Sequence, residues 1–169
     1  MDKGFRNTAF LLTGGNTADR QQHLQAAKIN IEKYCGHIIA ASSIYETAAW
    51  GLTNQPSFYN QALQLQTNMP AEELMQTLLN IEEEMGRVRT VKMGPRIIDI
   101  DILFLNDEII NTSFLSVPHP YLHQRRFALI PLAEIAPQLI HPILKKNIDE
   151  LLELCGDELP VKKKLTDEG

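Results

Sequence analysis

Two aspartates, Asp99 and Asp101, stand in a segment whose other residues are apolar. Residues 98–104 alternate with a period of two, which predicts a β-strand. We expect one face of this strand to carry the apolar side chains of Ile98, Ile100, Ile102 and Phe104. The two carboxylates would share the other face, roughly 6–7 Å apart. That arrangement suits one or two divalent cations with phosphate oxygens bound between the carboxylates.

Four basic residues precede this strand in a chain that is otherwise acidic. They are Arg87, Arg89, Lys92 and Arg96. Guanidinium donors next to oxygen ligands are typical of sites that bind an anion together with a hard cation. The alternative interpretation is a solvated strand face with surface ion pairs. Aspartate is depleted in strands, so two of them in an Ile-rich run favour the ligand site.

The composition is that of one globular domain. The 169 residues are 44% hydrophobic and 22% charged, with a net charge of −5 and a pI near 5.5. We expect a domain over 1–156 and a charged, flexible tail over 157–169. The acidic balance argues against binding to nucleic acid or to an anionic membrane, so phosphate binding must be local.

The cysteines and the apolar segments indicate the compartment. Cys35 and Cys155 lack the spacing of metal ligands, which favours a reduced, cytoplasmic chain. We find no signal-peptide pattern at the N-terminus. Residues 127–144 are apolar on average but contain several prolines and charged or polar residues, which excludes a membrane-spanning helix there.

The hydrophobic periods predict an α+β domain. Strands are expected at 8–13, 37–45, 58–67 and 98–104, and helices at 19–34, 70–85, 126–136 and 147–155, with a short strand near 108–110. Gly14 and Gly15 are interpreted as a turn after the first strand. The order strand-helix-strand-strand-helix-strand is ferredoxin-like: helices pack on one face of a mainly antiparallel sheet, and the other face stays free for a ligand.

Two further segments carry groups that suit a ligand. Residues 117–129 combine two imidazoles, two guanidiniums and aromatic rings on a proline-marked loop. Phe58 and Asn60 share one face of their predicted strand, where an aromatic ring and an amide can stack on a flat heterocycle and bind its edge. The alternative for both residues is an ordinary role in core and turn.

The motifs that carry these groups resemble one enzyme family. The runs are Gly86-Arg-Val-Arg89, Gly94-Pro-Arg-Ile-Ile-Asp-Ile-Asp-Ile-Leu-Phe104, Val117-Pro-His-Pro120, Arg125-Arg-Phe127 and Pro131-Leu-Ala-Glu-Ile-Ala-Pro137. They closely resemble 6-hydroxymethyl-7,8-dihydropterin pyrophosphokinases of folate biosynthesis, and the similarity runs from about Ala9 to about Leu154. The resemblance implies transfer of the terminal diphosphate of ATP to the pterin hydroxymethyl oxygen, with release of AMP.

The resemblance also implies roles for individual residues. Asp99 and Asp101 would hold two Mg²⁺ ions, Arg87 and Arg96 would neutralise charge on the transferred group, and Arg89 would assist. The positions similar to ATP contacts are Glu82, Ile102, Ser116, His119 and Arg125, with Ile102 lining the adenine pocket. The pterin would be sandwiched by Phe58 and Phe127, bound at its edge by Asn60, and enclosed by the backbone around Thr47, Ala48 and Trp50. No residue stands out as an obligatory general base.

Two other functions remain open at this point. A two-metal nucleotidyltransferase also sets paired aspartates on a ferredoxin-like sheet, but it has no use for the pterin pocket. A non-catalytic module that binds RNA would need a basic surface, and Asp99 and Asp101 would repel its phosphates. We therefore expect a monomeric, cytoplasmic enzyme whose partners are the small molecules ATP and 6-hydroxymethyl-7,8-dihydropterin.

Overall fold

The computed structural model describes residues 4–48, 56–86 and 97–164. The strands are β1 (Asn7–Gly15), β2 (His37–Ala41), β3 (Tyr45–Thr47), β4 (Phe58–Thr67), β5 (Asp99–Leu105), β6 (Ile110–Asn111), β7 (Ser116–Val117) and β8 (Val161–Lys163). The helices are α1 (Arg20–Tyr34), α2 (Ala71–Glu84), α3 (Arg126–Ile135) and α4 (Ile148–Leu154), with a 3₁₀ turn at Leu122–Gln124.

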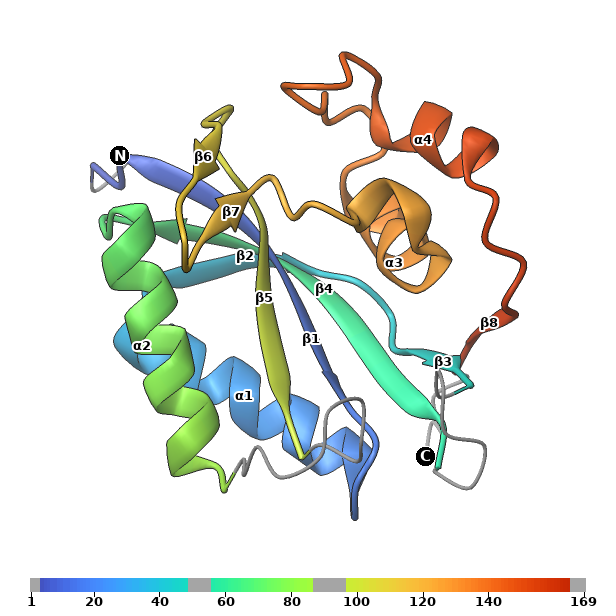
Figure 1. The fold of residues 1–169 in the computed structure, drawn as a ribbon. Coiled ribbons are helices and arrows are strands. Elements are labelled where there is room, and N and C mark those ends of the chain that lie inside the picture. Colours follow the sequence, from blue (N-terminus) through green and yellow to red (C-terminus); the bar gives the residue numbers. More distant parts are fainter. Residues whose placement is uncertain (1–3, 49–55, 87–96, 165–169) are drawn as a thin grey trace.

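The main sheet has the strand order β5-β1-β4-β3-β8, and β2 also pairs with β4 (Figure 1). Every strand pair in the described part of the chain is antiparallel, which confirms the predicted α+β class. β6 and β7 form a separate hairpin beside β5. Within the described ranges, no helix has both the length and the apolar character needed to cross a bilayer.

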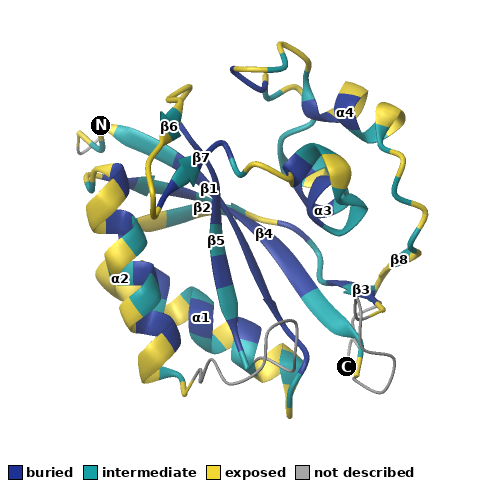
Figure 2. Cartoon of the chain, in the orientation of Figure 1, coloured by how far each residue is buried: buried dark blue, intermediate teal, exposed yellow. Residues whose placement is uncertain are grey.

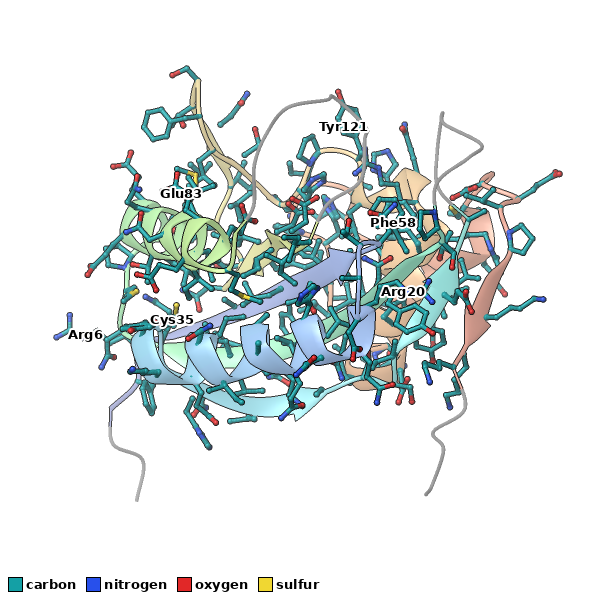
Figure 3. The ribbon with its side chains drawn as sticks, turned by 90° about the horizontal axis from the view of Figure 1, so that it is seen from below. Arg6, Arg20, Cys35, Phe58, Glu83 and Tyr121 are labelled. Carbon is teal, nitrogen blue, oxygen red and sulfur yellow. The ribbon has the colours of Figure 1, made fainter. Side chains whose placement is uncertain are left out.

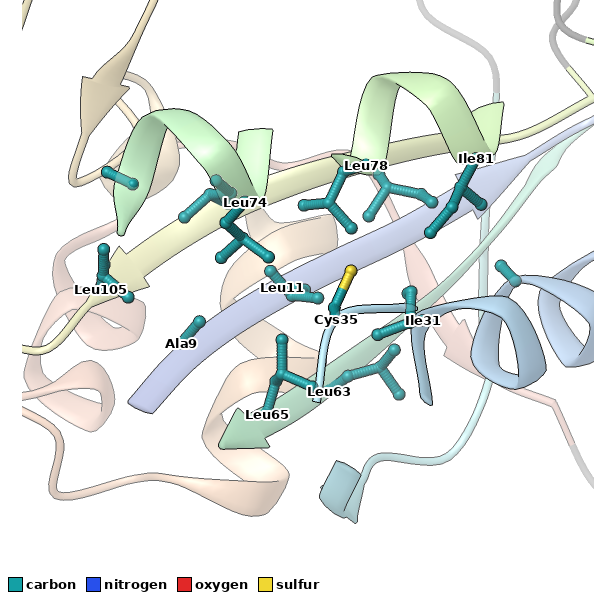
Figure 4. Packing of buried hydrophobic residues seen from close by; sticks show 14 of the residues in the cluster. Ala9, Leu11, Ile31, Cys35, Leu63, Leu65, Leu74, Leu78, Ile81 and Leu105 are labelled. Carbon is teal, nitrogen blue, oxygen red and sulfur yellow. The ribbon is translucent and has the colours of Figure 1, made fainter. Parts of the chain in front are cut away.

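Helices α1 and α2 cover one face of the sheet. Asp19 accepts a hydrogen bond from the Gln22 backbone N–H at 3.1 Å and so caps α1. The buried residues recur at helical spacing: Leu24, Ala27 and Ile31 on α1, and Leu74, Leu78 and Ile81 on α2. They pack on Ala9 and Leu11 of β1 and on Leu63 and Leu65 of β4 (Figure 4). This core holds the middle strands in a fixed register.

The two helices of the ferredoxin-like core, α1 and α2, lie on one face as predicted, but the C-terminal helix α3 covers part of the opposite face, which was expected to stay free for a ligand. Phe10 and Leu12 of β1 point to this side and belong to a second core, together with Leu129 and Leu132 of α3. Helix α3 carries an apolar face of its own that is buried against the sheet, and α4 packs on α3. Figure 2 shows the buried residues along β1, β4 and β5. The part of this face that α3 leaves uncovered lines a cavity.

A bulge in β5 corrects a second prediction. Ile102 pairs with Leu11, but Phe104 pairs with Phe10, so Leu103 is an extra residue in the strand. Ile98, Ile100 and Ile102 therefore face α1 and α2, whereas Phe104 turns to the other core. There its ring meets that of Phe10 edge-on, with centroids 6.5 Å apart. A strict period of two cannot anticipate one inserted residue.

Residues 161–163 of the C-terminal segment form a strand that the sequence did not predict. Strand β8 lies inside the 157–169 range that was expected to be a flexible tail, and it pairs with β3. The Lys164 backbone N–H also donates to the Ile44 carbonyl at 2.8 Å. The free edge of β3 offers backbone groups that need partners, and the charged segment supplies them.

Candidate active site

The strand register brings the predicted site residues to one face of the sheet. Gly14 pairs with Asp99 on one side and with Asn60 on the other. Leu12, two residues earlier, pairs with Asp101. Directly paired residues point to the same face, so both carboxylates and the amide share the face that α3 partly covers. Because β1 lies between β5 and β4, Asn60 stands two strand spacings, about 10 Å, from Asp99.

Gly14 makes room for Asn60. A Cβ atom on Gly14 would lie 2.2 Å from Asn60 Nδ2 and 3.3 Å from the Tyr59 carbonyl oxygen, so the amide lies directly across the glycine. Asn60 Nδ2 donates to the Thr13 carbonyl at 3.3 Å, and the residue is only 6% exposed. The interpretation of Gly14 and Gly15 as a turn is wrong, since both lie inside β1. Gly14 allows the close approach of Asn60 and does not reverse the chain.

These residues line a cavity of about 760 Å³. It contains every predicted site residue that falls in the described part of the chain: Thr47, Ala48, Phe58, Asn60, Glu82, Asp99, Asp101, Ile102, Ser116, His119, Arg125 and Phe127. Trp50, Arg87, Arg89 and Arg96 lie outside the described residues, as does Lys92. Elements far apart in the chain therefore meet around one space large enough for a sizeable ligand.

The aromatic end of the cavity, formed by Thr47, Phe58, Asn60 and Phe127, lies over β3, β4 and the start of α3. Phe58 lies on the opposite side of the sheet from α1, as Tyr121 does (Figure 3). The hydroxyl Oγ1 of Thr47 is buried without a hydrogen-bond partner among the described residues, and Thr47 is 3% exposed. A buried polar atom of this kind usually has a partner, so a ligand group that completes its hydrogen bond would fit here.

The carboxylate end of the cavity, formed by Glu82, Asp99 and Asp101, lies where α2 meets β5. Glu82 is 4% exposed, and its Oε2 accepts a hydrogen bond from the Ile100 backbone N–H at 2.6 Å. Ile100 lies between Asp99 and Asp101, so the hydrogen bond from its N–H to Glu82 holds the backbone that positions both carboxylates. Sequence reasoning expected only a nucleotide contact at Glu82 and missed this structural role.

The donor set at the carboxylate end fits a hard divalent cation. Asp99 and Asp101 are partly exposed oxygen donors on one face of β5. No cluster of three or more His, Cys, Asp or Glu that would form an all-protein metal site occurs in residues 4–48, 56–86 and 97–164. Mg²⁺ commonly takes one or two carboxylates and completes its shell with water and substrate phosphates. The pair therefore suits an ion that arrives with a phosphorylated ligand.

His119 is held in the neutral form near the carboxylate end. Its backbone N–H donates to the Leu103 carbonyl at 3.1 Å, and its ring Nδ1 accepts from the Tyr121 backbone N–H at 3.3 Å. Burial, together with the charge of Arg125, lowers the pKa of His119 to about 4. Because Nδ1 is an acceptor, the neutral ring carries its proton on Nε2 and offers a donor without a positive charge.

We expect the ring of His119 to keep one charge state from pH 6 to pH 9. The lowered pKa also means that the unfolded chain binds more protons than the folded chain between about pH 6.5 and 4, so stability should fall as the pH drops through that window. Titration of the His119 ring signals by NMR measures the pKa, and denaturation at each pH measures the stability. In the His119→Gln variant, stability should fall less steeply between about pH 6.5 and pH 4, because the titrating ring is gone. An inflection in the His119 ring signals near pH 6.5 would contradict the lowered pKa.

Several residues of the cavity were not anticipated. They are Leu12, Gly14, Met75, Leu78, Leu79, Ile100, Phe114, Leu115, Pro120, Tyr121 and Gln124. Pro120, Tyr121 and Gln124 had a sequence signal, since they lie in the 117–129 loop, and the Tyr121 ring centroid stands 5.2 Å from the Arg125 guanidinium. The others are mostly apolar residues whose place in the cavity follows from how α2, β1 and the 114–116 segment come together.

Comparison with known proteins identifies relatives of this chain. Residues 10–137 match the family model described as 7,8-dihydro-6-hydroxymethylpterin-pyrophosphokinase (HPPK). The 2-amino-4-hydroxy-6-hydroxymethyldihydropteridine pyrophosphokinase of Aquifex aeolicus is 42% identical over 143 residues, which cover 85% of this chain and 89% of the relative. The enzyme of the same name from Bacillus subtilis is 40% identical over 134 residues, or 79% of this chain and 80% of the relative.

A solved structure shares the fold. The crystal structure of Plasmodium falciparum HPPK-DHPS, wild type with pteroate, superposes with a TM-score of 0.73 at 19% sequence identity. The match covers 91% of this chain but 43% of the other, so this chain spans less than half the length of that protein. At this identity the likeness bears on the fold alone.

Proposed function

Because the chain belongs to the HPPK family and is a pyrophosphokinase of folate biosynthesis, we propose that the cavity over β1, β4 and β5 is its active site. There the hydroxymethyl oxygen of 6-hydroxymethyl-7,8-dihydropterin attacks the β-phosphorus of ATP. The bond from that phosphorus to the α,β-bridging oxygen breaks, the hydroxyl proton is lost, and AMP leaves. Family membership sets aside the nucleotidyltransferase and the RNA-binding module.

The observation that carries this proposal is the distance between the two ends of the cavity. Asn60 and Asp99 are paired to the same glycine from opposite sides, about 10 Å apart. A pterin at the aromatic end would point its hydroxymethyl group toward β5, where the phosphates are held. Binding two substrates in line on a rigid sheet accelerates transfer by removing the entropy cost of orienting them.

The aromatic end would bind the pterin. Phe58 and Phe127 offer two ring faces for a flat heterocycle, and the Asn60 amide offers a donor and an acceptor for its edge. The unpartnered Thr47 hydroxyl supplies one more hydrogen bond. Ala48 lines the same end, and Trp50, by resemblance, completes it.

The opposite end would bind ATP. Asp99 and Asp101 would hold two Mg²⁺ ions, which, when bound, neutralise the charge of the triphosphate. His119 would donate a hydrogen bond from Nε2, Arg125 would contribute a positive charge, and Ser116 would offer its hydroxyl. Ile102 would line the adenine pocket, next to Glu82. By resemblance, Arg87 and Arg96 would stabilise charge on the transferred group and Arg89 would assist.

We expect ATP, Mg²⁺ and 6-hydroxymethyl-7,8-dihydropterin to yield AMP and the pterin diphosphate in equal amounts. Turnover should stop when the metal is chelated and return when Mg²⁺ is added, because the bound cations would offset the repulsion between the triphosphate and the carboxylates of Asp99 and Asp101. Chromatography of the nucleotides and pterins measures both products. Release of ADP would point to an ordinary kinase, and release of pyrophosphate to nucleotidyl transfer.

The expectation of a cytoplasmic monomer stays a prediction. Two free cysteines are compatible with a reducing compartment, and Cys35 lies in the core, where burial raises the pKa of its thiol to about 11. Light scattering of the purified protein at several concentrations would measure the oligomeric state.

A further inference from the structure

The C-terminal segment Asp157–Lys164 contacts both walls of the aromatic end, and we propose that it positions these walls for the pterin. We call this segment the strap. It lies beyond residues 10–137, which match the family model. One wall is the first turn of α3, with Phe127, and the other is the end of β3, with Thr47. The inference rests on the proposed function, since it takes the aromatic end as the pterin site.

The strap caps α3 at its first residue. Oδ2 of Asp157 accepts a hydrogen bond from the Arg126 backbone N–H at 3.1 Å. Arg125, at the N-cap position, provides no side-chain cap of its own. The other oxygen, Oδ1, accepts from the Leu159 backbone N–H at 3.0 Å, which orients the carboxylate. A carboxylate at a helix N-terminus satisfies a free N–H and complements the helix dipole, so it fixes the turn that carries Phe127.

The strap also completes the sheet beside β3. Val161 pairs with Thr47, and Lys163 pairs with Tyr45. The Lys164 N–H donates to the Ile44 carbonyl at 2.8 Å, one residue before β3 begins. Strand β3 has only three residues and pairs with β4 on its other side, so without the strap it would be a short edge strand. Short, singly paired strands open easily, and the Thr47 hydroxyl would lose its place.

The far end of α3 has its own connection to β3. The Tyr45 hydroxyl donates to Glu134 Oε1 at 2.7 Å, and the Ser43 backbone N–H donates to the same oxygen at 3.0 Å. Burial raises the pKa of Glu134, but these hydrogen bonds and the nearby Lys163 outweigh it and lower the pKa overall. The carboxylate therefore stays charged at neutral pH. The Phe127 end of α3 therefore depends on the strap, whereas the hydrogen bonds at its Glu134 end involve Tyr45 and Ser43, which lie outside the strap.

Two substitutions test the strap at separate contacts. Asp157→Ala removes the cap, and Lys164→Pro removes one N–H donor while it leaves the rest of the chain intact. In each variant we expect the KM for the pterin to rise about fivefold, with the KM for ATP and kcat changed by less than about twofold. Amide hydrogen exchange at residues 45–47 should accelerate. The matched controls are Glu158→Ala, an exposed neighbour, and Lys164→Ala, which keeps the N–H; both should retain the wild-type pterin KM.

The outcomes separate the strap from a general effect on stability. An unchanged pterin KM in folded Asp157→Ala and Lys164→Pro, or an equal rise in both KM values, would overturn the inference. If Lys164→Pro fails to fold, Asp157→Asn provides the second test. It keeps one acceptor oxygen, so its pterin KM should lie between those of the wild type and Asp157→Ala. Phe127→Ala provides the reference for the pterin site. If it leaves the pterin KM unchanged, the site assignment has failed, whereas a rise in Phe127→Ala without one in Asp157→Ala rejects the strap alone.

Discussion

Replacement of Asp101 by asparagine is expected to lower kcat roughly a thousandfold, with little change in stability. The substitution keeps the shape of the side chain but removes a negative charge and an anionic oxygen donor from the face of β5 that lines the cavity. A cation that neutralises the transferred diphosphate would lose a ligand. The transition state would then be less stabilised, which lowers kcat. Asp99→Asn should behave in the same way, since both carboxylates would serve the same ions.

The measurement is the rate of AMP release over a range of Mg²⁺ concentrations. Asp107→Asn makes the same chemical change at an exposed turn after β5 and should keep the wild-type rate. The double variant should be little slower than the slower single variant, because groups that act as a unit are not additive. A folded Asp101→Asn protein with more than about a tenth of the wild-type kcat would exclude this carboxylate from the catalytic centre.

Replacement of Gly14 by alanine is expected to raise the KM for the pterin roughly tenfold or more and to lower the free energy of unfolding by about 1–3 kcal/mol. The new Cβ would stand 2.2 Å from Asn60 Nδ2, so the amide must leave its position across β1. Its hydrogen bond to Thr13 would be lost at the same time. The edge of the pterin would then lack the group proposed to bind it. Steady-state kinetics and chemical denaturation measure the two effects.

A double-mutant cycle isolates this contact. In an Asn60→Ala background the obstructing amide is gone, so Gly14→Ala should cost less than about 1 kcal/mol of stability and should not raise the pterin KM further. Gly156→Ala is the matched control, because outside the neighbouring residues no atom lies within 4 Å of the added Cβ. It should leave both the pterin KM and the free energy of unfolding unchanged. Equal effects of Gly14→Ala in both backgrounds would show that the cost arises elsewhere, for example at the Tyr59 carbonyl, 3.3 Å away.

The local pattern of the chain determined much of the site. The alternation of Asp99 and Asp101 with isoleucines predicted a strand with two carboxylates on one face, and β5 has that arrangement. The hydrophobic periods at 19–34 and 70–85 predicted helices where α1 and α2 lie. The motifs around Asp99 and in residues 117–137 led to the family. Each of these properties depends on neighbours within a few residues, whose periods of 2 and 3.6 are visible in a single sequence.

Only the tertiary structure decided how these parts meet. One inserted residue in β5 turned Phe104 to the opposite core, and pairing with two partners made Gly14 part of a strand instead of a turn. Helix α3 covered a face that was expected to be open, and residues 161–163 became a strand beside β3. Register, sheet order and edge pairing are set by contacts between residues up to about 120 positions apart. Such contacts leave no period in the sequence, because they depend on which distant surfaces bury each other best.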